Sequence, residues 1–249
     1  MINEINVLKN KFYDIKKRGW IESVRNDCGG IGITFENLIG IPANEFEIPD
    51  FGQIEIKTKT LGSDSYTTLF NCVPTGPHYH EVKRLKDSYG YPDSILKDKK
   101  VLNAIINCIY EVKIGLDFYL IIRVDRKKQK LFLLVLDRHK NLIEKKIYWD
   151  FDILEEKLNR KLKYLAIITA KKKVIEGKKH FNYNSMKILK LKNFETFIEL
   201  IEKGIIRVSF KLGVFRSGNR IGKIHDRGVS FSIKEEDLTY LFETIATFN

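Results

Sequence analysis

The segment that decides the fold is Pro49-Asp50-Phe51-Gly52-Gln53-Ile54-Glu55-Ile56-Lys57-Thr58-Lys59-Thr60. In its second part isoleucines alternate with charged residues, and this period of two predicts a β-strand over residues 54–60. On such a strand Glu55 and Lys57 share one face, while the isoleucines anchor the other face in the core. The sequence therefore predicts a half-buried strand that carries a carboxylate and an ammonium group side by side, shortly after Asp50.

Two carboxylates and a lysine in one small site match the needs of phosphodiester hydrolysis. Asp50 and Glu55 offer the oxygen ligands that Mg²⁺ prefers, and Lys57 can orient or activate a metal-bound water and offset developing charge. Glu36, beside the apolar face of a short helix predicted around residues 34–39, is a further candidate acid. The simpler alternative, an exposed strand face with an ordinary Glu–Lys pair, stays open.

The Glu-x-Lys pattern alone carries little information in a chain this rich in both residues. The pattern recurs at Glu81-Lys83, Glu111-Lys113, Glu144-Lys146, Glu155-Lys157 and Glu176-Lys178. The pair at Glu111 is the strongest competitor, because apolar residues flank it as well. The Pro-Asp step just upstream and the strict alternation favour residues 50–57.

The rest of the chain predicts helices and strands in mixed order. Helices are expected over residues 2–18, 151–161, 193–203 and 234–243, and strands over 66–73, 118–124, 131–136, 164–169, 205–212 and 229–233. Residues 74–100, with Pro and Gly among polar residues, are expected to form a long loop or insertion. This order predicts an α/β or α+β fold around a mixed sheet flanked by helices.

Composition bounds the class of protein. The 249 residues include 44 Lys and Arg against 32 Asp and Glu, so the net charge is +12, and the isoelectric point is about 9.4. Such a surface favours a polyanionic partner, nucleic acid rather than a membrane, although lysine-rich solvated faces remain the alternative. There is no signal peptide and no long apolar run, so we expect a cytoplasmic protein.

Several other chemistries find no support in the sequence. The cysteines, Cys28, Cys72 and Cys108, are odd in number and widely spaced, so we expect reduced, mostly buried thiols. His78 and His80 have no evident third ligand, so we predict no metal site there. The glycine-rich phosphate-binding loop of nucleoside triphosphatases and the serine or cysteine nucleophile signatures are absent from the sequence, which disfavours nucleoside triphosphate hydrolysis and acyl transfer.

A second group of residues is strongly basic and glycine-containing. It lies between two expected strands, and its candidate DNA-contacting residues are Lys211, Arg216, Arg220, Lys223, His225, Asp226 and Arg227. A two-stranded ribbon fits the major groove, where arginine pairs with the O6 and N7 atoms of guanine. A mobile basic loop that touches only phosphates is the alternative.

With these motifs in place the sequence resembles the MvaI/BcnI family of type II restriction endonucleases, relatives of the mismatch-repair nickase MutH. The likeness is carried by residues 32–38, 49–51 and 54–58, and it continues through residues 68–70, 148–152, 161–166 and 213–231. Arg216 and Arg227 stand where a relative has histidine, which puts the recognition sequence in doubt.

The resemblance implies a PD-(D/E)xK nuclease with two lobes around a DNA cleft. The catalytic lobe would span residues 1–170 and the DNA-recognition lobe residues 171–249, with interleaving lobes as the alternative. Asp50, Glu55 and Lys57 would be catalytic, with the two carboxylates as metal ligands, and Glu36 would be an accessory acid. Mg²⁺ would be the cofactor, Mn²⁺ a substitute and Ca²⁺ inactive.

The resemblance also implies how the enzyme would act. It would cut double-stranded DNA as a monomer, nicking the strands in turn at a short pseudosymmetric CCNGG-like site. A cognate DNA methyltransferase would act on the same site without forming a stable complex. Two rivals stay open: a MutH-like nickase that depends on partners, and a DNA-binding protein without catalytic activity.

Overall fold

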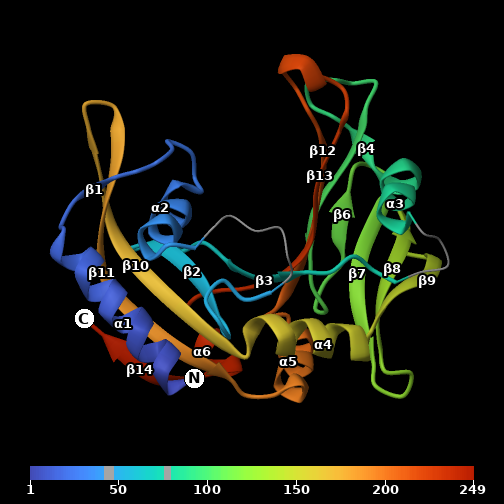
Figure 1. The fold of residues 1–249 in the computed structure, drawn as a ribbon. Coiled ribbons are helices and arrows are strands. Elements are labelled where there is room, and N and C mark those ends of the chain that lie inside the picture. The colour runs from blue at the N-terminus through green and yellow to red at the C-terminus, as the bar shows by residue number, and fades with distance from the viewer. Residues whose placement is uncertain (42–47, 76–79) are drawn as a thin grey trace. The chain divides into compact units, whose positions relative to one another are not determined.

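The structure is a computed structural model that describes residues 1–41, 48–75 and 80–249 (Figure 1). Its chain forms two compact units. Unit 1 comprises Met1–Ser65, Leu158–Lys192 and Leu238–Asn249, and unit 2 comprises Tyr66–Lys157 and Asn193–Asp237. The sequence predicts a boundary near residue 170, with interleaving lobes as the alternative. The two compact units interleave along the chain, which passes between them after residues 65, 157, 192 and 237.

Unit 1 is built on a mixed sheet. Its strands are β1 (Ile21–Glu22), β2 (Ile54–Thr60), β10 (Tyr164–Ile175), β11 (Lys178–Leu191) and β14 (Phe242–Phe248). The order is β1-β11-β10-β2, with β14 also on β11; β2 and β10 run parallel, and the other pairs are antiparallel. β2 is thus the strand that makes this sheet mixed, and a mixed sheet is what the sequence predicts.

Two helices pack on this sheet: α1 (Ile2–Lys17) and α2 (Gly30–Ile39). The helical spacing of apolar residues in α1 buries Leu8, Phe12 and Ile15, which join Phe35 of α2 in one core with the β2 isoleucines. α2 ends at Gly40, whose left-handed backbone closes the last turn. Burial of these side chains fixes both helices, and with them β2, in the core.

Unit 2 contains two antiparallel sheets. The first has the order β3-β13-β12-β5-β4, and its strands are β3 (Thr67–Asn71), β4 (Tyr91–Pro92), β5 (Lys100–Ile106), β12 (Arg207–Val214) and β13 (Ile224–Ile233). The second runs β6-β7-β8-β9: β6 (Val112–Ile114), β7 (Phe118–Asp125), β8 (Lys130–Asp137) and β9 (Leu142–Asp150). The β7–β8 pair is the hairpin that the sequence predicts.

Helices and aromatic side chains complete unit 2. The helices are α3 (Glu81–Tyr89), α5 (Phe194–Glu202) and the short η1 (Gly218–Arg220), and α4 (Phe151–Leu162) runs from unit 2 into unit 1. Buried rings of Phe70, Phe197 and Phe231 lie 5.1–5.8 Å apart. Trp149 packs edge-on against Phe231 and donates its indole hydrogen to the carbonyl of Cys72 at 2.9 Å. The ring cluster therefore joins β3, β9, β13 and α5.

Two predicted elements are wrong. Residues 74–100 are not simply a loop, because α3 buries Val82 and Leu85 three residues apart and β4 pairs with β5. The closing helix expected over residues 234–243 shrinks to α6 (Leu238–Leu241), and β14 follows on the edge of β11, where its β-branched residues suit a strand.

Smaller findings concern the thiols and the helices. Cys28, Cys72 and Cys108 all lie in the described residues and form no disulfide; Cys28 is exposed, contrary to the expected mostly buried set, while Cys72 is buried. Within the described residues, no helix has the length and apolar content needed to cross a bilayer. His78 lies outside the described residues.

Candidate active site and basic ribbon

The alternation of β2 has the predicted effect. Ile54 and Ile56 are 0% and 3% exposed and belong to the core of unit 1. Glu55 lies on the opposite face but is itself only 1% exposed, and it pairs with Leu165 in the parallel ladder to β10. Lys57 on the same face is half-buried. The candidate carboxylate is therefore held in a desolvated position by a strand that packs on both faces.

Asp50 is brought to this strand by a tight turn. Phe51 and Ile54 exchange backbone hydrogen bonds of 2.9 and 2.8 Å, and Gly52 between them has a φ of +59°, which favours glycine. The turn lets Oδ2 of Asp50 accept a hydrogen bond from the backbone amide of Ile56 at 2.8 Å. A side chain five residues before Glu55 in the sequence is thus fixed next to it in space.

The two oxygens of Glu55 have different surroundings. Lys57 Nζ donates to Oε1, and Lys161 Nζ, near the end of α4, lies 3.5 Å from the same atom. Among the described residues, Oε2 is buried without a hydrogen-bond partner. Burial raises the pKa of Glu55 above its ordinary value, Lys57 opposes that shift, and the charge of Asp50 adds to it.

Lys161 is a site residue that sequence reasoning missed. It ends a predicted helix and immediately precedes the expected strand at residues 164–169, so nothing local marks it. The signal lies in the pairing: β10 runs parallel to β2 with Tyr164 opposite Ile54, so residues just before β10 meet the start of β2. Only a prediction of this parallel pair reveals the second lysine.

Glu36 approaches the same group from α2. It is half-buried; burial raises its pKa, Asp50 raises the pKa further, and Lys57 and Arg25 lower it. A Cβ at Gly32, one turn earlier, would lie 3.5 Å from Oε1 of Glu36 and 3.3 Å from Oγ1 of Thr58. Glycine at this position therefore leaves room for α2 to approach β2 closely.

The donor set fits a hard divalent cation. Mg²⁺ takes one or two carboxylates and fills its remaining positions with waters and phosphate oxygens. Asp50 and Glu55 supply two carboxylates, and the buried Oε2 of Glu55 has no hydrogen bond to lose. Across the described ranges, no cluster of three or more His, Cys, Asp or Glu side chains has metal-binding geometry. These residues thus match a cation that keeps much of its water.

The competing Glu-x-Lys pair has ordinary surroundings. Glu111 forms an ion pair with Lys140 at 3.5 Å, and the pKa of its carboxyl is below its ordinary value, first through a backbone hydrogen bond and then through Lys140. Lys113 of β6 is exposed. Glu111 therefore forms an ordinary surface ion pair with Lys140 in unit 2, and within the described residues it forms no ion pair with Lys113.

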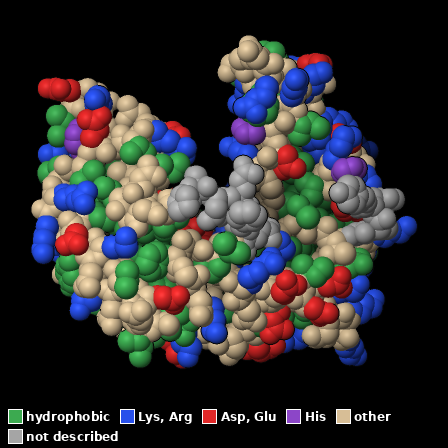
Figure 2. Space-filling view, in the orientation of Figure 1, with side chains coloured by type: hydrophobic (Ala, Val, Ile, Leu, Met, Phe, Trp, Pro, Cys, Tyr) green, Lys and Arg blue, Asp and Glu red, His purple; other side chains and the backbone are tan. Residues whose placement is uncertain are grey.

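The basic segment forms a two-stranded ribbon at the end of β12 and β13, closed by η1. Basic side chains gather over it (Figure 2). Arg220, Lys223, Asp226 and Arg227 are exposed, and Asp226 accepts the amide hydrogen of Gly228 at 2.7 Å. The ribbon predicted from sequence is therefore present, and both strands extend into the segment expected as a loop, which narrows to residues 215–223.

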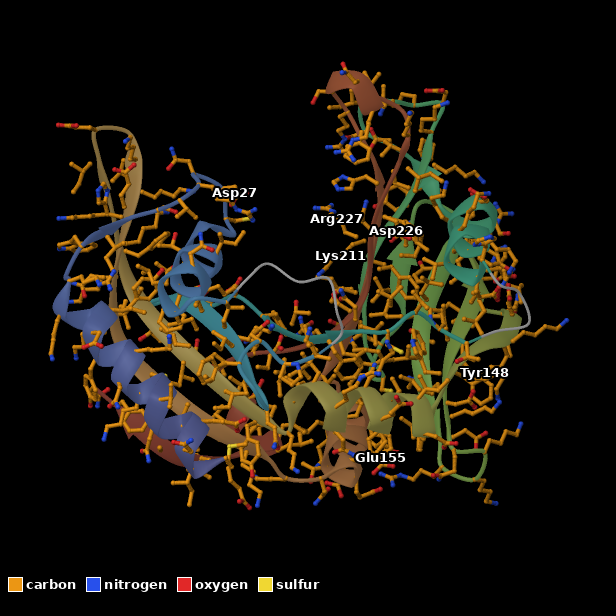
Figure 3. All side chains as sticks on the ribbon, viewed as in Figure 1. Asp27, Tyr148, Glu155, Lys211, Asp226 and Arg227 are labelled. Carbon is orange, nitrogen blue, oxygen red and sulfur yellow. The ribbon has the colours of Figure 1, made fainter. Side chains whose placement is uncertain are left out.

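Lys211 and Arg227 lie together at an irregularity in this ribbon. The β12–β13 register shifts between Phe210 and Leu212, and both side chains leave the same side of the ribbon (Figure 3). Burial lowers the pKa of Lys211, and the charge of Arg227 lowers it further. Two neighbouring positive charges, those of Lys211 and Arg227, favour binding of an anionic group or of a hydrogen-bond acceptor at this position.

Arg216 and His225 are engaged by neighbours in unit 2. Arg216 donates to the carboxylate of Asp93, and His225 stacks on Phe215 with ring centroids 4.2 Å apart and an interplanar angle of 12°. Arg220 covers Phe215 at 4.1 Å. Asp93, Phe215, Arg216 and His225 border a cavity of about 260 Å³, whose lining also includes Arg227 and Asn103.

Comparison with known proteins shows the family of the chain. The model of the MvaI/BcnI restriction endonuclease family matches residues 9–242. The chain belongs to the MvaI/BcnI restriction endonuclease family. A solved structure described as a restriction endonuclease MvaI–cognate DNA substrate complex is 32% identical, covers 98% of each chain and has a TM-score of 0.90.

A second solved structure gives a weaker superposition. MvaI in the absence of DNA is 29% identical, covers 100% of this chain and 99% of its own, and has a TM-score of 0.63. No curated protein matches the chain. Family membership makes the protein a type II restriction endonuclease, and its mixed α/β fold is the one that the sequence predicts.

Proposed function

We propose that this restriction endonuclease hydrolyses double-stranded DNA with Mg²⁺ at a short pseudosymmetric CCNGG-like site. The observation that carries the proposal is the arrangement around Glu55: a buried carboxylate with a lysine on one oxygen, a free second oxygen and Asp50 beside it. Membership of the family and the similarity to a protein solved as a DNA complex support double-stranded DNA as the substrate.

In the proposed mechanism Asp50 and Glu55 hold the metal ion. When bound, this ion would supply Lewis-acid stabilisation of the phosphate and a more acidic water. Lys57 shares the strand face of Glu55, so its side-chain nitrogen is placed to orient the attacking water as the ammonium group, or to accept its proton as the neutral amine. Lys161 would help to keep Glu55 ionised despite its burial, and Glu36 would assist from α2.

Different basic residues would bind the DNA backbone and recognise its base sequence. Phosphate-contacting lysines give affinity without sequence information, and the ribbon at residues 211–227 reads base edges. We propose that the catalytic function belongs to unit 1 and base reading to unit 2. The enzyme would act as a monomer that nicks the strands in turn, in the cytoplasm, on sites that a cognate methyltransferase protects without a stable complex.

The test is digestion of a sequenced plasmid by the purified chain alone, with mapping of the cleavage ends. We expect double-strand cuts at one short motif with Mg²⁺ or Mn²⁺, and no cutting with Ca²⁺ or EDTA. A nicked circle should precede the linear product if the strands are cut in turn. Persistent nicking of one strand would favour the MutH-like alternative, and binding without any cutting would favour the non-catalytic one.

A further inference from the structure

The pair Asp93–Arg216 ties the connection between β4 and β5 to the tip of the β12–β13 ribbon. Asp93 is 1% exposed, whereas Arg216 is about half exposed at 50%. Nη2 of Arg216 donates to Oδ2 of Asp93 at 2.8 Å, and Nε lies 3.2 and 3.3 Å from the two carboxylate oxygens. One complete edge of the guanidinium is therefore occupied inside unit 2.

Asp93 is itself held rigidly. Its Oδ1 accepts the amide hydrogens of Ile95 and Leu96, both at 3.0 Å, and its own amide donates to the carbonyl of Lys99 at 2.8 Å. Nη2 of Arg216 also reaches Oγ of Ser94 at 3.1 Å. The turn that precedes β5 thus presents a fixed carboxylate to the ribbon.

Anchoring Arg216 also fixes the residues next to it. Phe215 exchanges backbone hydrogen bonds across the tip, with the carbonyl of Lys223 at 3.0 Å and the amide of Gly222 at 2.8 Å. Its ring lies between His225 and the guanidinium of Arg220. The positions of these two polar groups consequently depend on where Arg216 holds the backbone.

We infer that Asp93 and Arg216 are a positioning pair that fixes the reading ribbon, and that Arg216 reads no base itself. This inference rests on the proposed function. It departs from the expectation that Arg216 contacts DNA, because Asp93 occupies the Nε–Nη2 edge, one of the two guanidinium edges suited to bidentate contact with guanine, and holds the group inside unit 2. Base contacts fall to residues without such an anchor, with Lys211 and Arg227 first among them.

A double-mutant cycle separates positioning from direct reading. The full chain is compared with Asp93→Asn, Arg216→Ala and the double variant, and Arg216→Lys is the conservative variant. The readout is the ratio of kcat/KM on the cognate duplex to kcat/KM on duplexes with single base-pair substitutions, with the melting temperature measured in parallel. Glu81→Gln is the matched control, because Glu81 is a buried carboxylate of unit 2 that accepts hydrogen bonds from Nε and Nη2 of Arg84.

The positioning role predicts a shared loss of discrimination. Asp93→Asn and Arg216→Ala should each lower the ratio roughly tenfold, about the size of one lost base contact, and at more than one base-pair position. The double variant should be no worse than either single variant, because the two residues act as a unit. Arg216→Lys should retain part of the discrimination, and Glu81→Gln should lower the melting temperature without changing the ratio.

Other outcomes contradict the inference. If Arg216→Ala relaxes one base-pair position while Asp93→Asn keeps full discrimination, Arg216 reads a base directly. If both variants discriminate like the wild type, the pair has no role in reading. Should Asp93→Asn fail to fold, the exposed Arg216→Ala and Arg216→Lys still decide the question. A wild-type chain that cuts no sequence selectively contradicts the proposed function, whereas a selective wild type with a fully selective Asp93→Asn contradicts this inference alone.

Discussion

The charged groups on β2 and on the β12–β13 ribbon are held in opposite ways. Glu55 is 1% exposed and is fixed by the strand that carries it, because alternate isoleucines anchor that strand in the core. On the ribbon Arg220, Lys223 and Arg227 are exposed. The tip of the ribbon is held by the ion pair of Arg216 with Asp93 and by the stacking of Phe215 on His225. Groups suited to chemistry are desolvated in place, whereas groups suited to reading reach outward and need separate support.

The largest expected effect is on the rate of cleavage, and it concerns the buried carboxylate of Glu55 on β2. Glu55→Gln keeps the shape of the side chain and removes its charge, so cleavage should fall by at least about 10²–10³-fold, the scale of one lost electrostatic contact in an active site. Single-turnover cleavage of a cognate duplex measures the loss. Glu111→Gln, from the competing Glu-x-Lys pair, is the control. If Glu111→Gln lowered the cleavage rate more than Glu55→Gln, the active site would have to be assigned to unit 2.

On the ribbon a smaller and more selective effect is expected. Lys211→Ala or Arg227→Ala should cost discrimination at one base-pair position, roughly tenfold to a hundredfold, because each removes one contact to a base edge. Cleavage rates on single-substitution duplexes provide the measurement, with the exposed Lys145→Ala as the control. A uniform loss of affinity on all duplexes would instead assign these residues to phosphates.

Replacing exposed lysines outside the ribbon should have a still smaller effect on DNA binding. Lys171 and Lys172 are exposed on β10 where it extends beyond its pairing with β2. Replacing both with Ala should reduce the slope of log affinity against log salt by about 1.8, if each contacts one phosphate. The loss should be equal for cognate and unrelated duplexes. Lys127→Ala with Lys128→Ala, in the β7–β8 turn, is the matched control, and an equal change there would remove any special role of β10.

The smallest expected effect concerns acid stability. Arg216, and then the amide of Leu96, hold the pKa of Asp93 well below its usual range, so the folded state favours the ionised carboxylate. Because the folded pKa is the lower one, this contribution is complete above the ordinary aspartate pKa of about 3.9 and is lost as the pH falls below it. Asp93→Asn should therefore flatten the fall in melting temperature between about pH 5 and pH 3, whereas the exposed Asp64→Asn should not.

Features of the fold that depend on neighbouring residues could be predicted from the sequence, whereas features that depend on residues far apart in the chain could not. The bounds of β2 agree with the prediction because alternation is a local signal that burial enforces. The expected loop at residues 74–100 hides α3, whose buried side is marked only by Val82 and Leu85. The predicted last helix fails because β14 is stabilised by an edge of β11, a contact that no local pattern shows.

In the candidate site, too, residues close in sequence could be predicted and residues distant in sequence could not. Asp50, Glu55 and Lys57 lie within eight residues, so spacing and alternation place them together. Lys161 joins them only through the parallel pairing of β10 with β2. Asp93 meets Arg216 across 123 positions of sequence, so an ion pair that decides the role of an arginine has no local signature.

The central claim is that the β2 site performs chemistry and does not supply binding. Lys57→Ala tests it most directly when binding and cleavage are measured on one cognate duplex, with Lys59→Ala from the same strand face as the control. We expect cleavage by Lys57→Ala to fall about 10²–10⁴-fold, as for loss of a group that moves a proton, while site-specific binding stays nearly intact. Loss of binding together with cleavage, or cleavage at the wild-type rate, would contradict the claim.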